Sequence, residues 1–189
     1  MLNIILFGPP GAGKGTQSQY LKDKYRLAYF STGDILREEM AAKTETGLKV
    51  KALIDAGNLV GDDIVVEMIR QKVKENIKGD GFLFDGFPRT VRQAEMLDEM
   101  FADFNLKING VLSLEVPQDM LIERMLERGK TSGRADDNID TIRHRFEEYD
   151  AKTKPVTNYY EKSGNLHKIN GVGKIEEVFD RLCAEIDKM

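Results

Sequence analysis

Apolar residues along the chain fall into short runs that alternate with segments of helical spacing. The runs are β-branched, aliphatic or aromatic and have the length of buried strands, at 3–7, 27–31, 81–85, 110–116 and 166–170. Between and after these runs apolar residues recur three or four positions apart, as at Val178, Leu182 and Ile186. Because helix and strand alternate and the strands lack a polar face, the pattern predicts an α/β fold, with helices on both faces of a parallel sheet.

Two segments interrupt this alternation. Residues 31–60 make helical turns without a strand and pass through Gly47, so we expect an inserted helical subdomain there. Residues 128–138, RGKTSGRADDN, are rich in Gly, Ser, Asp and Asn, which predicts a loop. In parallel sheets of this kind, ligands bind at the carboxyl ends of the strands.

The stretch LFGPPGAGKGTQ, residues 6–17, has the spacing of a phosphate-binding loop. Gly8, Gly13 and Lys14 satisfy G-x-x-x-x-G-K, after a predicted strand and before a helix that begins near Lys14. Such glycines let backbone N–H groups converge on phosphate oxygens, and the lysine reaches the outer phosphates. The alternative is a glycine-rich turn without a ligand, but the lysine, the spacing and the flanking elements together favour a phosphate site.

Position 15 departs from the usual loop. Most such loops have Ser or Thr there, whose hydroxyl binds magnesium, but this chain has Gly15 and then Thr16. Phosphates and waters could supply most of the coordination of Mg²⁺, and a carboxylate on a neighbouring strand could orient those waters. Asp85, at the end of GFLFD, is the candidate, and we expect no direct protein ligand. The alternative for Asp85 is a turn residue before Gly86.

Several arginines lie near predicted loops and strand ends. Phosphoryl transfer depends on alignment and on positive charge around the transferring group, so these side chains are candidates for catalysis. Taken singly each could be a surface residue, and Arg124 and Arg128 could pair with Glu123 and Glu127 along a helix. No general base is evident, which favours an acceptor that is itself a phosphate, since its oxygen is already anionic. The arginines are Arg37, Arg89, Arg124, Arg128, Arg134 and Arg145.

Composition narrows the classes of protein. A net charge of -4 and a pI near 5.4 disfavour a general nucleic-acid binder. A single cysteine excludes an internal disulfide, and no C-x-x-C pair is present for a structural zinc. No basic leader opens the chain and no apolar run approaches the roughly 18 residues that span a bilayer. We expect a cytoplasmic protein that binds neither membranes nor nucleic acid.

Motifs over almost the whole chain resemble those of one family. GPPGAGKGTQ, STGDILR, LVGDDIV, GFLFDGFPRT, RGKTSGRADDN and KIN occur in the order found in adenylate kinases of the nucleoside monophosphate kinase family. The resemblance implies a P-loop three-layer α/β/α core with a five-stranded parallel sheet, formed by 1–30, 61–127 and 139–189. It also implies a helical AMP-binding subdomain at 31–60 and a short lid at 128–138 that lacks zinc cysteines. The implied activity is reversible transfer of the terminal phosphoryl group from Mg-ATP to AMP, giving two ADP, by a monomer.

The resemblance also implies roles for individual residues. The expected ATP-binding residues are Gly11, Ala12, Gly13, Lys14, Gly15, Thr16, Arg124, Arg128 and Gly173. The expected AMP-binding residues are Thr32, Arg37, Asn58, Leu59, Val60, Gly86, Phe87, Pro88, Arg89, Gln93, Arg134 and Arg145. The expected catalytic residues are Lys14, Asp85, Arg89, Arg124, Arg128, Arg134 and Arg145.

Three alternatives stay open at this point. Pyrimidine monophosphate kinases tend to have Ser-Ala-Gly-Asp and Pro-Arg-Asn where this chain has STGD, with Thr32, and PRT, so AMP is favoured over UMP or CMP. A P-loop hydrolase or GTPase is disfavoured by Gly15 and by the lack of an Asn-Lys-x-Asp motif. A nucleotide sensor would have little use for arginines on both sides of a phosphoryl group.

Gly61 departs from the Pro, Ser or Thr that the family leads us to expect after LV.

Overall fold

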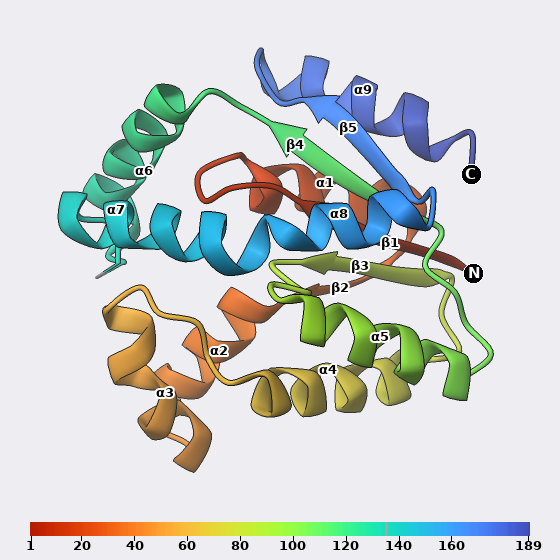
Figure 1. Ribbon diagram of the computed structural model, residues 1–189, viewed down its shortest axis with the longest axis horizontal. Helices are drawn as coiled ribbons and strands as arrows, with labels where there is room; N and C mark the ends of the chain where they lie inside the picture. Colours follow the sequence, from red (N-terminus) through yellow and green to blue (C-terminus); the bar gives the residue numbers. More distant parts are fainter. Residues whose placement is uncertain (135) are drawn as a thin grey trace.

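A parallel sheet forms the centre of the molecule (Figure 1). The computed structural model describes residues 1–134 and 136–189, and within them five strands pair in the order β2-β3-β1-β4-β5. Their bounds lie within one residue of the predicted runs, which confirms those predictions. The strands are β1 (Leu2–Phe7), β2 (Ala28–Ser31), β3 (Gly81–Asp85), β4 (Gly110–Glu115) and β5 (Leu166–Asn170).

Side chains alternate between two separate cores on the two faces of the sheet. Ile5 of β1 packs with Phe84 of β3 in one core, and Ile4 packs with Leu83 in the other. All four are fully buried, which explains why the strands show no polar face in the sequence. The three-layer prediction is therefore confirmed. The first core is covered by α4 (Asp62–Asn76), α5 (Val91–Asp103) and α8 (Pro155–Lys162), and the second by α1 (Lys14–Tyr25), α6 (Gln118–Ser132), α7 (Ile139–Glu148) and α9 (Ile175–Ile186).

Two helices begin at the carboxyl edge of the sheet because capping side chains start them there. Ser31, the last residue of β2, accepts a hydrogen bond from the Asp34 N–H at the start of α2 (Thr32–Ala41). Thr90, after β3, accepts one from the Gln93 N–H at the start of α5. The first turns of both helices therefore lie beside the ends of β2 and β3, where a ligand site is expected.

Residue 31 ends β2, and residues 32–60 form helices and turns without a strand, so the prediction for 31–60 is confirmed apart from its first residue. They form α2 (Thr32–Ala41) and α3 (Glu45–Asp55), which lie side by side at one end of the molecule (Figure 1). The two helices approach so closely that a Cβ on Gly47 would lie 2.1 Å from the Glu39 carbonyl oxygen. That this pair forms a substrate-binding subdomain stays a prediction.

The predicted loop at 128–138 was wrong over its first half. Helix α6 continues through Ser132 and ends at Gly133, whose φ of 64° is the left-handed conformation that commonly terminates a helix. Gly129, which suggested a loop, lies within the helix, and its lack of a side chain lets the backbone of Asp137 pack against it: a Cβ there would lie 2.7 Å from the Asp137 carbonyl oxygen. Residue 135 of the predicted lid lies outside the described residues. After α7 the chain makes a π-helical turn, η1 (Tyr149–Thr153).

Candidate functional site

The glycine-rich loop runs from the end of β1 to the start of α1. A Cβ on Gly8 would lie 2.9 Å from the Leu114 carbonyl oxygen, and one on Gly11 would lie 2.9 Å from the Leu121 carbonyl oxygen. Glycine is therefore needed where the loop passes against β4 and α6. Lys14 bends back over the loop, and its Nζ donates to the carbonyl oxygens of Gly8 at 2.8 Å and Pro9 at 3.0 Å. The loop thus holds the ammonium group at the amino end of α1, where anions bind.

Lys14 lies in an environment that disfavours its positive charge. Burial and the positive charges of Arg89, Arg145 and Arg128 together lower its pKa to about 8, although Asp85 acts in the opposite direction. An anionic ligand would relieve both the repulsion and the lack of solvation. The site is therefore electrostatically prepared for a group with several negative charges.

Asp85 ends β3 and faces the loop. It is 8% exposed and accepts a hydrogen bond from the Tyr29 hydroxyl at 3.2 Å. Burial raises its pKa, and Lys14 and Arg89 oppose that shift. A Cβ on Gly15 would lie 3.6 Å from Asp85 Oδ2, so the carboxylate borders the position where the usual loop hydroxyl is missing.

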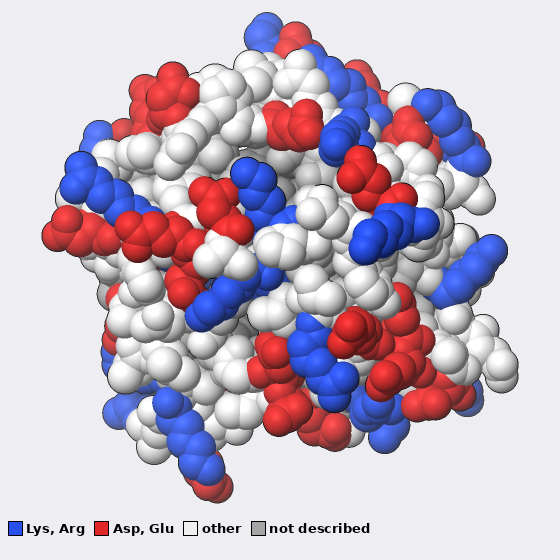
Figure 2. Space-filling model, viewed as in Figure 1, with Lys and Arg blue, Asp and Glu red and all other residues white. Residues whose placement is uncertain are grey.

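A large pocket opens beside the loop, and we call it the loop pocket. Its walls come from the loop, from α6 and from the turn before α9. Figure 2 shows charges of both signs interspersed over one face of the molecule, with basic side chains set into its hollowed middle. All the predicted ATP-binding residues line the loop pocket, together with Asp85: Gly11, Ala12, Gly13, Lys14, Gly15, Thr16, Arg124, Arg128 and Gly173.

A second hollow, the insertion pocket, lies between α2, the segment after α3 and the start of α5. Thr32, which is 4% exposed, donates from its hydroxyl to the Gly86 carbonyl oxygen at 2.7 Å and so joins α2 to the turn after β3. Most of the predicted AMP-binding residues line this pocket: Thr32, Arg37, Asn58, Leu59, Val60, Gly86, Arg89, Gln93 and Arg145. The remaining three lie elsewhere, Arg134 in the loop pocket and Phe87 and Pro88 in the pocket described next.

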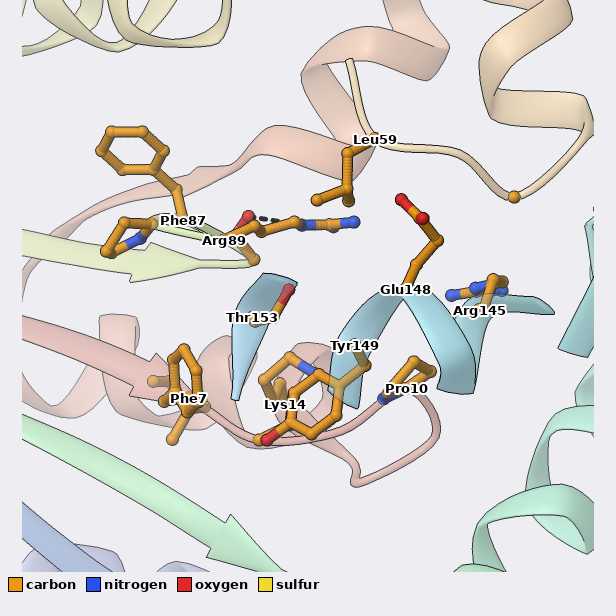
Figure 3. Close-up of a pocket in the computed structure, with 15 residues that line it drawn as sticks. Phe7, Pro10, Lys14, Leu59, Phe87, Arg89, Arg145, Glu148, Tyr149 and Thr153 are labelled. Atoms are coloured by element: carbon orange, nitrogen blue, oxygen red, sulfur yellow. Dashed lines mark hydrogen bonds between the residues drawn. The ribbon is translucent and has the colours of Figure 1, made fainter. Parts of the chain in front are cut away.

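A central pocket connects the two regions (Figure 3). Lys14 and Arg89 enter it from opposite sides, and Arg145 and Glu148 project into it from α7. The Arg89 Nε donates to the Gly86 carbonyl oxygen at 2.7 Å, which fixes the direction of its guanidinium group. Arg89 and Arg145 line all three pockets, so these two cations lie between the loop pocket and the insertion pocket.

Two aspartates that the sequence analysis missed hold the arginines of α6 and α7. Asp137 accepts from Arg128 Nε and Nη2, both at 2.6 Å, and from Arg145 Nη1 at 3.1 Å. Asp136 accepts from Arg145 Nη1 at 2.7 Å. These bidentate and shared bonds orient two guanidinium groups before any ligand arrives. The adjacent aspartates of RADDN, beside Arg134, were the available signal.

Asp34 has a similar position between two other arginines. Its Oδ1 accepts from Arg37 Nη2 at 2.5 Å and lies 3.7 Å from Arg134 Nη2. Burial lowers the pKa of Arg134, and the positive charges of Arg37 and Arg128 lower it further. The contact between Asp34 and Arg134 joins α2 to the segment after α6.

The fold and the site together define a P-loop protein, with a glycine loop between a central strand and a helix and cations at the carboxyl edge of a parallel sheet. The family model for adenylate kinase matches residues 6–165. A protein named adenylate kinase from Flavobacterium psychrophilum is 45% identical over 190 residues, which cover 100% of both chains. One from Porphyromonas gingivalis is 45% identical over 188 residues, which cover 100% of this chain and 97% of the relative. One from Thermobifida fusca is 48% identical over 180 residues, 95% of each chain. The chain therefore belongs to the adenylate kinase family.

Proposed function

We propose that this protein transfers the terminal phosphoryl group of Mg-ATP reversibly to AMP, giving two ADP. Family membership supports this activity, and one observation carries the argument from the site. Arg89 and Arg145 line both the loop pocket and the insertion pocket, so two ligands in these pockets would have the same cations between them. A hydrolase would need only one nucleotide pocket, because its acceptor is water.

We assign ATP to the loop pocket. The backbone N–H groups of the loop would donate hydrogen bonds to the phosphates of ATP, and Lys14 would form an ion pair with them. Arg124 and Arg128 would neutralise phosphate charge from the side of α6. The Gly173 carbonyl would lie near the base. Magnesium fits the site because the Asp85 carboxylate, next to Gly15, could orient waters bound to the ion, whose other ligands would be phosphate oxygens. When bound with ATP, the ion would shield the charge that builds up on the transferring group.

We assign AMP to the insertion pocket. Arg37 and Arg145, which line this pocket, and Arg134, which lines the loop pocket, would hold its phosphate. Thr32 and Gln93 would contact its base. Gln93 is 2% exposed, so a base that reached its amide would lie in a site largely closed to water. An amide side chain can donate and accept at once, as the edge of adenine requires.

The transfer needs alignment and positive charge rather than a base. A phosphate oxygen of AMP attacks the γ-phosphorus, the bond from that phosphorus to the β,γ-bridging oxygen breaks, and both products are ADP. Arg89 would stabilise the charge that spreads over the group in transit. Burial and the positive charge of Arg145 together lower the pKa of Arg89 to about 10, so the side chain is still cationic near neutral pH.

We further propose a monomer in the cytoplasm. The one cysteine, Cys183, is buried and free, as suits a protein that is not built on disulfides. Within the described residues no helix has both the length and the apolar character that crossing a bilayer requires. Sedimentation of the pure protein tests the oligomeric state.

The test of function measures ADP formation from Mg-ATP with AMP, UMP, CMP, GMP or water as the sole acceptor. Rapid ADP formation with AMP, and little with the others, is the expected result. Equal or greater rates with UMP or CMP would favour a pyrimidine monophosphate kinase. Loss of ATP without any nucleotide acceptor would instead favour a hydrolase.

A further inference from the structure

Asp62 lies behind the wall of the insertion pocket and is bonded to Gln93, which lines that pocket. It is the first residue of α4, and its Oδ1 accepts from Gln93 Nε2 at 2.8 Å and from the Thr90 hydroxyl at 3.1 Å. Gln93 is among the residues that line the pocket, and Asp62 is not. Any influence of Asp62 on a ligand in this pocket therefore passes through the Gln93 amide.

The Gln93 amide is held at both ends. Its Oε1 accepts from the Arg89 backbone N–H at 2.7 Å, while its Nε2 donates to Asp62. In a flipped amide the NH₂ group would face the Arg89 N–H and the oxygen would face the Asp62 carboxylate, so both hydrogen bonds would be lost. Because Gln93 is 2% exposed, water could not replace the lost bonds, so the flipped orientation is strongly disfavoured.

The locked amide leaves a defined pattern for a ligand. Of its two N–H groups and two oxygen lone pairs, Asp62 and the Arg89 N–H use one each, which leaves one donor and one acceptor. Adenine offers the complementary pair, an amino donor beside a ring-nitrogen acceptor. Hypoxanthine and guanine offer the reverse, a carbonyl acceptor beside a ring N–H donor, and would match only a flipped amide.

We propose that Asp62 is a positioning residue that selects a 6-aminopurine over a 6-oxopurine in the acceptor nucleotide, by fixing the orientation of the Gln93 amide. This inference rests on the proposed function, in which Gln93 contacts the base of AMP. It adds a determinant of base choice that lies outside the pocket itself.

The experiment compares kcat and KM for AMP and for inosine monophosphate, each with saturating Mg-ATP, in wild type and Asp62→Ala. The AMP-to-IMP ratio of kcat/KM should fall about tenfold, through the acceptor KM, because the amide loses a bond to a charged partner. The KM for Mg-ATP should stay unchanged. Asp62→Asn keeps an acceptor oxygen in the same place and should largely restore the ratio.

Asp63→Ala is the matched control. Asp63 is the next residue of the same helical turn, is acidic and is exposed, so its removal affects the amino end of α4 without touching Gln93. Its AMP-to-IMP ratio should equal that of wild type. Asp62→Ser suits a helix start but is too short to reach Nε2, and it replaces Asp62→Ala if that variant does not fold.

Gln93→Leu separates the two ways in which the inference can fail. If the ratio falls in Gln93→Leu but is unchanged in Asp62→Ala, Asp62 does not position the amide and the inference is overturned, while the proposed base contact stands. If the ratio is unchanged in both variants, Gln93 does not contact the base, so the inference and the proposed base contact are both overturned, whereas the proposed phosphoryl transfer is judged separately by ADP formation with AMP. A fall in Asp63→Ala equal to that in Asp62→Ala would assign the effect to the helix start and also overturn the inference.

Discussion

Raising the pH above 8 should weaken Mg-ATP binding, because Lys14 loses its proton there. Burial and the neighbouring arginines lower the pKa of Lys14 to about 8, and its Nζ lies at the loop where the phosphates are expected. ATP attracts the charged form, so binding should raise this pKa again. Nucleotide binding and proton uptake are therefore coupled.

The size of the effect follows from that value. With a pKa of about 8, roughly nine-tenths of the free protein carries the Lys14 charge at about pH 7 and roughly one-tenth at about pH 9. The Kd for Mg-ATP should therefore rise about tenfold over this interval. At about pH 8, binding should take up close to half a proton, since about half of the lysines are neutral before the nucleotide arrives.

The lowered pKa of Lys14 also makes the free energy of unfolding depend on pH. Unfolded lysine has a pKa of 10.5, so between about pH 8 and 10.5 the unfolded chain binds more protons at this position than the folded chain. The Lys14 contribution to the free energy of unfolding therefore rises with pH in this window. Stability and Mg-ATP affinity should thus change in opposite directions.

Isothermal titration calorimetry at several pH values, in two buffers of different ionisation enthalpy, measures both the Kd and the proton uptake. Lys14→Met is the control: it should bind weakly at every pH and take up no proton at this position. A wild-type Kd that is constant from pH 7 to 9, or equal proton uptake in Lys14→Met, would refute the assignment of the titration to Lys14.

Three further substitutions test other parts of the site and fold. Arg89→Ala should slow phosphoryl transfer by roughly 10²- to 10³-fold with an unchanged circular dichroism spectrum, and a near-normal kcat would contradict its proposed role. Thr32→Ala should lower the AMP-to-UMP ratio of kcat/KM about fivefold because the bond to Gly86 is lost, whereas an unchanged ratio would exclude Thr32 from base choice. Gly47→Ala should lower the Tm by about 5 °C, or about 2 kcal/mol, since its Cβ meets the Glu39 backbone. Gly61→Ala, with no atom within 4 Å of its Cβ, is the control in the same thermal melt, and an equal loss there would refute the steric argument.

Local patterns in the sequence were sufficient for the framework of the fold. The strands were predictable because both faces of the sheet are buried, which leaves continuous apolar runs such as 81–85. The phosphate loop was predictable because its spacing is local: Gly8, Gly13 and Lys14 lie within a few residues of one another. Each of these signals is complete within a single short segment.

Features that depend on distant contacts could not be predicted in this way. The glycine at 129 indicated a loop, but Asp137 packs against that position and the segment is helical. The bond from Gln93 to Asp62 joins residues 31 positions apart, and no local pattern marks it. The position of Arg145 beside Arg89 likewise depends on the packing of α7 against α6, which spacing alone does not specify.

The place of β1 in the sheet has a consequence for the order in which the molecule assembles. β1 is the first strand to be synthesised, yet it pairs with β3 on one side and with β4 on the other, and Ile4 is matched to Gly110 across the second pairing. Closing so long a stretch of chain is entropically costly and slows folding. An amino-terminal fragment that ends before β4 leaves the loop at residues 8–13 without the strand that flanks it. During synthesis, the contact of Gly8 with Leu114 of β4 can therefore form only after residue 114 has been added to the chain.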